Sequence, residues 1–599
     1  MNELLNHSLL EKAINDYELP LSYVFTINEL MNINEKNDDN LLTILISMFI
    51  YLYNGSICIK KNNNLKNLLS NLDVENPEKF MADFFSNIEN YSKIIGKPDE
   101  YKPLIYIKEK ESLYFEKYYT NEKKVNEILK ARREYKENNK DIEKIRSYVS
   151  SKTNLHEFQK AAVFLSLIKP FLIISGGPGT GKTTIIKYAI DYLIDNNIFK
   201  ENEIAITTPT GKASQRIKEL LSNYNIETST IHRLLRYNYI NDSFYYNSEN
   251  KLPYKMIILD EVSMVDIVLL RNFLEAIPDD CQLIMIGDKD QLPSVEAGTF
   301  IAKIIPENYQ NVFSSLLKGI VDEKHINDEK SNDSIVLLTK SFRSEKNILE
   351  FANKVNDGKT DLSIDKIDIS AINDYMTFND FIAYYDYINP LNFKKLYLSL
   401  LLKQFNEHYF KIVEELKSIE SSNAVDKIEL LREMLKIIES FKILTITNIG
   451  FYGCDRINDE FIDYLKKKLN KKSRFFSGIP VIINKNDYNI NVFNGNIGVL
   501  IEFSDGFKAV FLSSDVKIIP VDLLPDFNPA FAITVHKSQG SEYKRILLVI
   551  PEETRLSILT RQILYTGITR AKKAVLIAGK KENILNAIKN SIERESNIE

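Results

Sequence analysis

The clearest pattern in the sequence is an alternation of short apolar runs with longer amphipathic stretches. Between residues 169 and 290 the runs are PFLIIS, IAITT, KMIILD and CQLIMIG, and the stretch TTIIKYAIDYLI has apolar positions at helical spacing. Strands of a parallel sheet read as short continuous apolar runs, because helices cover both faces of such a sheet. The alternation therefore predicts right-handed βαβ units and an α/β fold.

A second alternating region runs from about residue 334 to residue 579, with the apolar runs ILTIT, FAITV, RILLVI and AVLIAG. Two stretches interrupt it. Residues 357–440 have a helical pattern, and residues 475–525 have the pattern of a small antiparallel β module. In that module IGVLIEF and FKAVFL flank Ser-Asp-Gly, which predicts a hairpin. We therefore expect one α/β domain over residues 153–333 and a second over residues 334–599 with two insertions.

The pattern before residue 153 is different. Residues 1–110 are expected to be mostly helical, with an extended piece, PLIYIKEKESLYFEKYYTNEK, near their end. The longest apolar run, residues 41–53, is shorter than the about 20 residues that a membrane span needs, so it predicts a buried helix. Residues 111–152 are expected to connect this domain to the first α/β domain. From residue 122 onward they are charged with few strong apolar positions, which predicts an exposed helix.

Composition narrows the class of protein. The 599 residues suit several domains, and 44% hydrophobic with 27% charged residues is globular. A formal net charge of −5 argues against a protein that coats nucleic acid by charge alone, although a local basic groove can still bind it. Cys58, Cys281 and Cys454 lie far apart, which argues against a disulfide framework or a zinc site. With no signal-peptide pattern, we expect a soluble cytoplasmic protein without membrane contact.

A glycine-rich loop follows the first strand of the first α/β region. GGPGTGKTT fits G-x-x-x-x-G-K-[ST] between a predicted strand and a predicted helix, which is the context that the motif requires. The glycines let backbone N–H groups face phosphates, and the helix N-terminus adds its positive dipole. Lys182 can then neutralise the β- and γ-phosphates of ATP, and Thr183 can ligate Mg²⁺. The expected phosphate-binding residues are Gly176, Gly177, Pro178, Gly179, Thr180, Gly181, Lys182, Thr183 and Thr184.

Carboxylates end two later apolar runs, KMIILD and CQLIMIG. IILDEVSMVD places Asp260 and Glu261 side by side, which costs repulsion unless a cation or a reacting water uses them. Asp260 would hold Mg²⁺ through water, and Glu261 would orient and deprotonate the attacking water. In LIMIGDKDQLPSVEAG, Gln291 is a candidate γ-phosphate sensor, because an amide can bond phosphate and water together. The alternative for the latter segment is a polar turn that closes a strand.

These blocks, in this order, resemble superfamily 1 helicases, and further segments resemble the RecD-like branch. TPTGKA (208–213) and TIHRLL (230–235) are similar to its two strand-contacting motifs, and LTKSFRS (338–344) to its fourth motif. FSGIPVIINKNDYNINVFNGNIGVL (476–500) is similar to the segment RPVM…NDY…FNGD.G, except that Asn496 replaces the usual acidic residue. AITVHKSQGSEY (532–543) and LYTGITRAKKAV (564–575) resemble motifs five and six. The resemblance covers about residues 155–580, and more weakly residues 103–129.

The resemblance implies an architecture and an activity. It implies two RecA-like P-loop domains, each a parallel sheet flanked by helices, with a small inserted β-barrel module and a mostly helical N-terminal domain. The implied activity is that of an ATP-dependent DNA helicase moving 5′→3′, with ATP and Mg²⁺ as cofactors. ATP would lie between the two α/β domains, where Arg343 and Arg570 would stabilise the charge that develops on the γ-phosphate. Gln159 lies where the family's adenine-reading glutamine does.

The same motifs supply candidates for contacts with single-stranded DNA. Small hydroxyl donors suit phosphates, and histidine rings can stack on bases. Each of these residues could equally be a helix cap or part of a core hydrogen bond. The candidates are Thr210, Lys212, Thr230, His232, Thr534, His536 and Ser538.

The resemblance also implies partners. In the RecD family the chain works with RecB and RecC at double-strand ends, as the exodeoxyribonuclease V assembly of break repair and recombination. We find no carboxylate–lysine nuclease constellation here, so nuclease activity would belong to a partner. Residues 1–110 lack a Lys/Arg stripe for DNA but hold many apolar side chains, including LLTILISMFIYLY, so we expect them to dock a RecC-like chain. The alternative is that all of these side chains form internal core.

Two other functions compete with this one. A stand-alone RecD-like helicase or a relaxase helicase would share the same motifs, but it would carry a larger N-terminal extension or a His-rich nicking domain, and residues 1–150 contain neither. A subunit that binds ATP without hydrolysing it is the third possibility. The presence of Glu261, Arg343 and Arg570 argues against that possibility.

Overall fold

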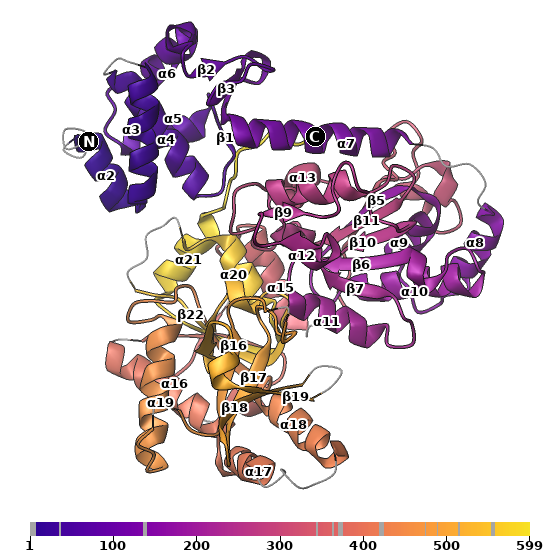
Figure 1. Cartoon of the computed structure of the whole chain (residues 1–599), viewed down its shortest axis with the longest axis vertical. Coiled ribbons are helices and arrows are strands. Elements are labelled where there is room, and N and C mark those ends of the chain that lie inside the picture. Colours follow the sequence, from indigo (N-terminus) through magenta and orange to yellow (C-terminus); the bar gives the residue numbers. More distant parts are fainter. Residues whose placement is uncertain are drawn as a thin grey trace.

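Figure 1 shows the computed structural model of the chain, in which the N-terminal unit, the first α/β domain and the second α/β domain follow one another along the sequence colours. The structure describes residues 7–34, 38–135, 141–342, 346–361, 364–368, 375–387, 389–417, 424–473, 475–487, 489–512, 516–552 and 558–599. The α/β fold with two parallel sheets, expected from the alternation of apolar runs, is confirmed.

The first sheet has six parallel strands. Their order is β12 (Ile335–Leu338), β5 (Phe171–Gly176), β11 (Gln282–Gly287), β10 (Met256–Leu259), β6 (Ile204–Thr208) and β7 (Glu227–Thr230). Side chains alternate between two apolar cores, so that Leu172 and Ile174 of β5 lie in one and Phe171 and Ile173 in the other. Helices on both sides, including α9 (Glu157–Ile168), α10 (Lys182–Asp195) and α13 (Ile267–Ala276), cover these faces.

The boundary expected at residue 334 is wrong. Strand β12 pairs with β5, for example Val336 with Ile174, so it belongs to the first sheet and not to the second. The sequence of a short apolar run does not show which sheet the strand joins. The pairing partner of β12 lies more than 150 residues earlier in the sequence. The first domain therefore extends beyond residue 333.

The second sheet also has six parallel strands. Their order is β13 (Asp365–Lys366), β14 (Phe381–Tyr385), β23 (Ala571–Ala578), β22 (Tyr543–Val549), β15 (Phe441–Thr445) and β21 (Ala532–Thr534). The four expected strands are confirmed as β15, β21, β22 and β23. The helical insertion expected over residues 357–440 is wrong in its first half, because β14 lies within the sheet. Only α16 (Pro390–Gln404), α17 (Glu407–Lys417) and α18 (Ala424–Ile438) are helical insertion.

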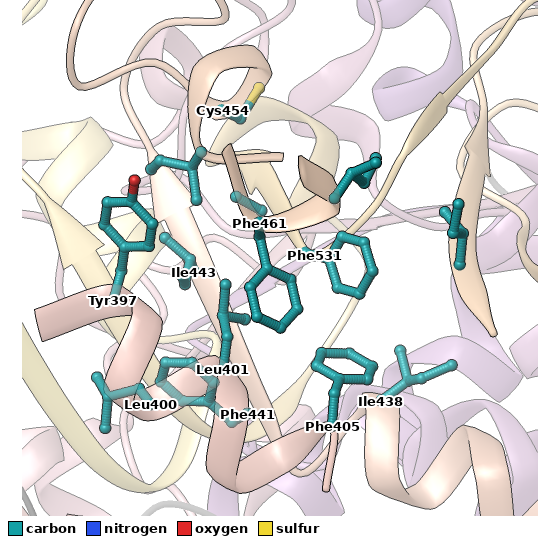
Figure 2. Close-up of a cluster of buried hydrophobic side chains, with 14 of the residues drawn as sticks. Tyr397, Leu400, Leu401, Phe405, Ile438, Phe441, Ile443, Cys454, Phe461 and Phe531 are labelled. Carbon is teal, nitrogen blue, oxygen red and sulfur yellow. The ribbon is translucent and has the colours of Figure 1, made fainter. Parts of the chain in front are cut away.

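An aromatic core joins this insertion to the sheet. Figure 2 shows Phe461 of α19 (Cys454–Lys468) and Phe531, next to β21, beside Phe405 at the end of α16. The Phe531 ring centroid lies 4.8 Å from that of Phe405 and 4.8 Å from that of Phe461, with interplanar angles of 84° and 82°. Edge-to-face rings of this kind add stability beyond burial alone. The inserted helices are therefore part of the second domain's core.

The small β module is a five-stranded antiparallel sheet. Its order is β19 (Val516–Pro520), β18 (Gly506–Leu512), β17 (Ile497–Phe503), β16 (Ile479–Ile483) and β20 (Phe527–Pro529). The predicted hairpin is confirmed, since Phe503 pairs with Gly506, whose φ of 122° suits glycine. Strand β20 extends the module past the expected end at residue 525.

The N-terminal unit packs helices α2 (Ser8–Tyr17), α3 (Leu21–Asn34), α4 (Asp39–Tyr53), α5 (Asn63–Asn71) and α6 (Pro77–Ser86) with a sheet ordered β1 (Cys58–Lys60), β4 (Ser112–Phe115), β3 (Leu104–Ile107) and β2 (Ile95–Gly96). The buried helix predicted at residues 41–53 is confirmed, since all of residues 41–50 of α4 are buried. Strand β4 shows that the unit continues past residue 110. No helix in the described ranges is long and apolar enough to cross a membrane.

Helix α7 (Glu116–Glu134) is not the exposed connector that its charged sequence predicts. Val125 and Leu129 are buried in the core beneath α13. Arg132 donates to the backbone carbonyls of Ile277 (3.3 Å), Pro278 (2.9 Å) and Cys281 (3.0 Å) at the end of α13 and beyond. The buried residues of this helix are Asn121, Glu122, Val125, Leu129 and Arg132, and only two of these five are apolar, which is why the apolar pattern is weak.

Candidate active site

The phosphate-binding loop connects β5 to α10. Gly179 and Gly181 have φ values of 79° and 86°, a backbone region that favours glycine, and they let the loop turn its N–H groups inward. Thr180 Oγ1 donates to the Gly177 carbonyl (2.8 Å). The Lys182 ammonium lies inside the loop, where Nζ donates to the carbonyls of Gly176 (2.5 Å) and Gly177 (3.2 Å). The expected loop geometry thus places one cation at the N-terminus of α10.

Buried carboxylates gather next to this loop, at the carboxyl ends of neighbouring strands. Asp260 follows β10, and Asp288 follows β11, which pairs with β5. Burial and the adjacent Glu261 raise the pKa of Asp260 to about 6, and Lys182 opposes that shift. Burial and Asp290 raise the pKa of Asp288 to about 6, again opposed by Lys182. The site therefore holds more negative charge than its own lysine balances.

Backbone strain marks the same place. Glu261 has a φ of 58°, in the left-handed region that a side chain other than glycine seldom adopts. Its N–H donates to Asp260 Oδ1 (2.9 Å). Such strain persists only where the surrounding structure enforces it, and it is common at functional sites.

Gln291 has an unmet hydrogen bond in this site. Its Nε2 donates to Asp288 Oδ2 (3.1 Å), which orients the amide. Its Oε1 is buried and has no hydrogen-bond partner within the described part of the chain. A buried acceptor without a donor is costly, so this oxygen is arranged for a donor from outside the protein.

The second α/β domain closes over the loop. Tyr565, on α20 (Arg561–Ile568), donates from its hydroxyl to Asp288 Oδ2 (3.3 Å), and a Cβ added at Gly177 would lie 2.8 Å from the same hydroxyl. Sequence reasoning missed Tyr565 as a site residue, although it lies within the LYTGITRAKKAV segment. No local sequence signal marks it, because its burial beside the phosphate-binding loop is a property of the folded chain.

Arg570 enters the site from the same helix-to-strand turn. Its guanidinium is buried, donates from Nε to the Thr566 carbonyl (3.0 Å) and from Nη1 to the Ser541 carbonyl (3.4 Å). Burial lowers its pKa, and the nearby carboxylates of Glu261 and Asp288 oppose that shift. The structure thus brings an arginine of the second domain to carboxylates of the first.

Arg343 lies outside the described residues. The residues before it do contact the phosphate-binding loop: Ser341 Oγ donates to the Pro178 carbonyl (3.0 Å), and the Phe342 N–H donates to the Gly179 carbonyl (2.9 Å).

Gln159 lies under the loop, where it is buried. Its Nε2 donates to the Thr180 carbonyl (2.9 Å), and its Oε1 accepts from the His156 N–H (2.9 Å). A Cβ at Gly181 would lie 2.2 Å from Nε2, so the contact with the loop is close. Gln159 therefore braces the phosphate-binding loop through both ends of its amide. Thr183 is half-buried on α10 and Thr184 is exposed.

Four hydroxyls proposed for DNA contact make local hydrogen bonds in this structure. Thr210 caps α11 (Gly211–Leu220), and Thr230 caps α12 (Ile231–Leu234). Thr534 Oγ1 accepts from the Lys537 N–H (3.3 Å), and the buried Ser538 donates to the Val535 carbonyl (2.6 Å). The helix-cap alternative stated for these residues accounts for the contacts seen.

The basic candidates are partly enclosed. Burial lowers the pKa of His232, whose ring packs 5.5 Å from that of Tyr237, and burial also lowers the pKa of His536. Burial lowers the pKa of Lys212 as well, and Glu439 of the second domain opposes that shift. Lys212 thus faces the second domain.

Helix α11 also joins the two α/β domains. Arg216 pairs with Glu542 (3.1 Å), and Asn496 Nδ2 donates to Gln215 Oε1 (3.5 Å). Asn496 is the position where the RecD-like pattern has an acidic residue. An amide can donate here, as a carboxylate could not.

Known proteins resemble both halves of the cleft. Residues 159–297 match the AAA domain family, and residues 529–578 match the UvrD-like helicase C-terminal domain family. The chain is 30% identical over 528 residues to RecBCD enzyme subunit RecD of Buchnera aphidicola subsp. Schizaphis graminum, covering 81% of this chain and 83% of that protein. The same subunit of Buchnera aphidicola subsp. Acyrthosiphon pisum is 32% identical over 531 residues, covering 82% and 83%. That of Haemophilus influenzae is 28% identical over 496 residues, covering 76% and 74%.

Proposed function

The chain belongs to the RecD family of superfamily 1 helicases, and from that premise we propose that it is the RecD-like subunit of a RecBCD-type exodeoxyribonuclease V complex. It is an ATP-hydrolysing DNA helicase. The proposed role is to move 5′→3′ along single-stranded DNA at duplex ends, with RecB-like and RecC-like partners, in double-strand break repair and recombination. The observation that carries the proposal is the cleft itself, in which Tyr565 and Arg570 of one domain reach the loop and carboxylates of the other.

Each group in the cleft has a proposed role in ATP hydrolysis. Lys182 binds the β- and γ-phosphates, and Glu261 deprotonates the attacking water. Gln291 offers its unpaired Oε1 to that water, while Arg570 and Arg343 stabilise the charge on the γ-phosphate. Gln159 holds the loop, and its proposed second role is to contact the adenine. Because these groups come from two domains, hydrolysis and release change the contact between the domains.

The residues present fit a Mg²⁺ ion bound together with nucleotide. Thr183 and Asp260 would hold it, and the ion would neutralise charge on the phosphates. No group of three or more His, Cys, Asp or Glu side chains within the described residues could hold a metal unaided. Mg²⁺ commonly uses one or two protein oxygens with phosphate oxygens and waters, and the excess carboxylate charge at Asp260 and Asp288 supports such a site.

Docking of the N-terminal unit on a RecC-like chain is supported by a different set of residues from those expected. The apolar run of residues 41–53 is mostly internal core, with only its end at Tyr53 (46% exposed) open to solvent, so it supplies little surplus surface. Exposed apolar side chains lie instead on α3, where Leu21, Phe25 and Ile33 are 59%, 53% and 48% exposed. We propose that this face of α3, residues 21–33, contacts the partner.

Strand displacement tests the proposed direction. Duplexes with a 5′ or a 3′ single-stranded tail are mixed with the purified chain and ATP, and release of the labelled strand is followed. The proposal predicts release from the 5′-tailed duplex. Release only from the 3′-tailed duplex would overturn it. Purification of the native chain with whatever binds it tests the partner assignment, and recovery of a fully active chain alone would favour a stand-alone helicase.

A further inference from the structure

Residues 590–599 connect all three parts of the molecule. After α21 (Lys581–Lys589) the chain leaves the second α/β domain and runs, in yellow in Figure 1, to the N-terminal unit and α7. At its start the Ile592 N–H donates to Gln562 Oε1 (3.0 Å). Farther on, the Ile57 N–H donates to the Glu595 carbonyl (3.1 Å), and the Asn597 N–H donates to Glu122 Oε1 (2.7 Å).

Arg594, midway along this segment, reaches the first α/β domain. Its Nη1 donates to the carbonyls of Gly298 (3.0 Å) and Glu296 (3.2 Å) and to Ser294 Oγ (3.4 Å). On the other side, a Cβ added at Gly55 would lie 2.2 Å from Arg594 Cζ, so the N-terminal backbone covers the guanidinium. These three acceptors are all neutral. Burial lowers the pKa of Arg594 to about 10, so holding a cation here costs free energy that a neutral side chain would not.

The loop that Arg594 holds, residues 292–298, directly follows Gln291. At one end, the Leu292 N–H donates to Thr566 Oγ1 (2.9 Å) and Gln539 Nε2 donates to the Leu292 carbonyl (3.1 Å), so the second α/β domain fixes it. At the other end, the Gly298 N–H donates to the Gly55 carbonyl (2.9 Å), beside the contacts of Arg594. Both ends of the loop are thus held by parts of the molecule outside the first domain.

We propose that Arg594 is a positioning residue for the Gln291 loop and that it makes the γ-phosphate site depend on the seated N-terminal unit. The proposal rests on the proposed role of Gln291. All three contacts come from Nη1, whose two N–H groups have fixed directions in the guanidinium plane, so they hold the loop in a more defined geometry than the freely rotating ammonium of a lysine would. Misplacement of a reacting group by about 1 Å can cost about 10²-fold in rate, so a small shift of residues 292–298 is enough to matter.

The kinetic test compares Arg594→Ala, Arg594→Lys and Gly55→Ala in the full chain. Lys589→Ala, which removes an exposed cation at the end of α21, is the matched control. At saturating ATP and single-stranded DNA, Arg594→Ala and Gly55→Ala should lower kcat by about tenfold or more, with KM for ATP changed by less than about twofold. Arg594→Lys should recover part of the loss. An unchanged kcat in Arg594→Ala, or a loss that tracks a lower unfolding temperature in every variant, would overturn the proposal.

A second readout does not depend on activity. Hydrogen exchange of the amides in residues 292–298 is measured without nucleotide in the wild type, Arg594→Ala and Lys589→Ala. Faster exchange is expected in Arg594→Ala alone, because its loop loses three hydrogen bonds to the segment. Equal exchange in all three would overturn the positioning role. A wild-type chain that hydrolyses no ATP would instead refute the proposed function, and the exchange result would still decide the contact.

Discussion

The nucleotide cleft and the N-terminal unit differ in how the surrounding groups satisfy their buried polar side chains. In the cleft the pKa values of Asp260 and Asp288 are raised to about 6, and Gln291 Oε1 has no partner in the described chain. In the N-terminal unit burial also raises the pKa of Glu122, but hydrogen bonds from Tyr114 (2.6 Å) and the Asn597 N–H (2.7 Å) oppose that shift.

Other charges of the N-terminal unit, such as Lys123 with Asp99, pair at the surface, where an ion pair contributes little. Glu122, which only stabilises the fold, is satisfied by its neighbours. Groups that await a substrate are not, and their unmet charge and hydrogen bonds mark the site. Substitutions in the cleft should therefore change ATP turnover, whereas substitutions at the surface of the N-terminal unit should leave turnover unchanged.

The largest effect is expected at Lys182. Lys182→Gln should abolish ATP hydrolysis, because the Lys182 ammonium is the charge held inside the phosphate-binding loop, while the fold and partner binding stay intact. A steady-state assay with single-stranded DNA, together with a melting curve, measures both. Wild-type turnover in this variant would refute the assignment of the loop.

Arg570→Ala should cut turnover by about 10³-fold, and Arg343→Ala likewise, because each arginine acts mainly in the transition state. ATP affinity, followed with a fluorescent nucleotide, should change far less. If Arg570→Ala loses nucleotide binding and turnover together, the arginine has a ground-state role and the assignment as a finger is wrong.

The third prediction concerns the pH dependence of the unfolding free energy at Asp260. Its pKa in the folded chain is raised to about 6 from the ordinary 3.8, so its charge opposes folding above pH 6 and that cost disappears as the pH falls from 6 to 4. Asp260→Asn should therefore raise the unfolding free energy at pH 7.5 by on the order of 1–3 kcal/mol, and by less at pH 5. Turnover should vanish in this variant.

Asp83→Asn, on the exposed side of α6 in the N-terminal unit, is the matched control for that measurement. It should change neither turnover nor stability at either pH. A stability gain at Asp83 as large as that at Asp260 would remove the contrast between the two regions.

The smallest effect on turnover is expected on α3. The double variant Leu21→Asp and Phe25→Asp should leave DNA-stimulated ATP hydrolysis unchanged, since both side chains are exposed and distant in sequence from the cleft. It should release the chain from its partner in a co-purification. Leu391→Asp, at a similarly exposed apolar position on α16, should not. Retention of the partner by the double variant would refute this face as the contact.

Short-range motifs pointed to most of the candidate-site residues, whose roles stay predictions. The loop from Gly176 to Thr184, the pair Asp260 and Glu261, and Gln291 each lie within a segment of a few residues, where glycine, a strand end and a helix start constrain the backbone directly. Arg570 was predicted only through its resemblance to motif six. The two sheets and the buried α4 followed from apolar runs whose length and periodicity are local properties.

What the sequence did not predict depends on contacts between distant residues. Strand β12 pairs with β5 and strand β14 with β23, and no local sequence pattern specifies these partners. The charged sequence of α7 predicts an exposed helix, because one of its anchors is Arg132, a residue type that is usually at the surface. Tyr565 and Arg594 act across domain boundaries, and neither has a periodic signature.

The most direct test of the account is strand displacement coupled to ATP hydrolysis. The purified chain is given a tailed duplex with ATP, or with an analogue whose β–γ bridge cannot be hydrolysed. We predict that the labelled strand is released only with ATP and that hydrolysis rises when DNA is added. Two results would contradict the conclusion that this chain is an ATP-driven DNA motor. One is strand release with the analogue, and the other is an ATP hydrolysis rate that does not change when DNA is added, with no strand released from either tailed duplex.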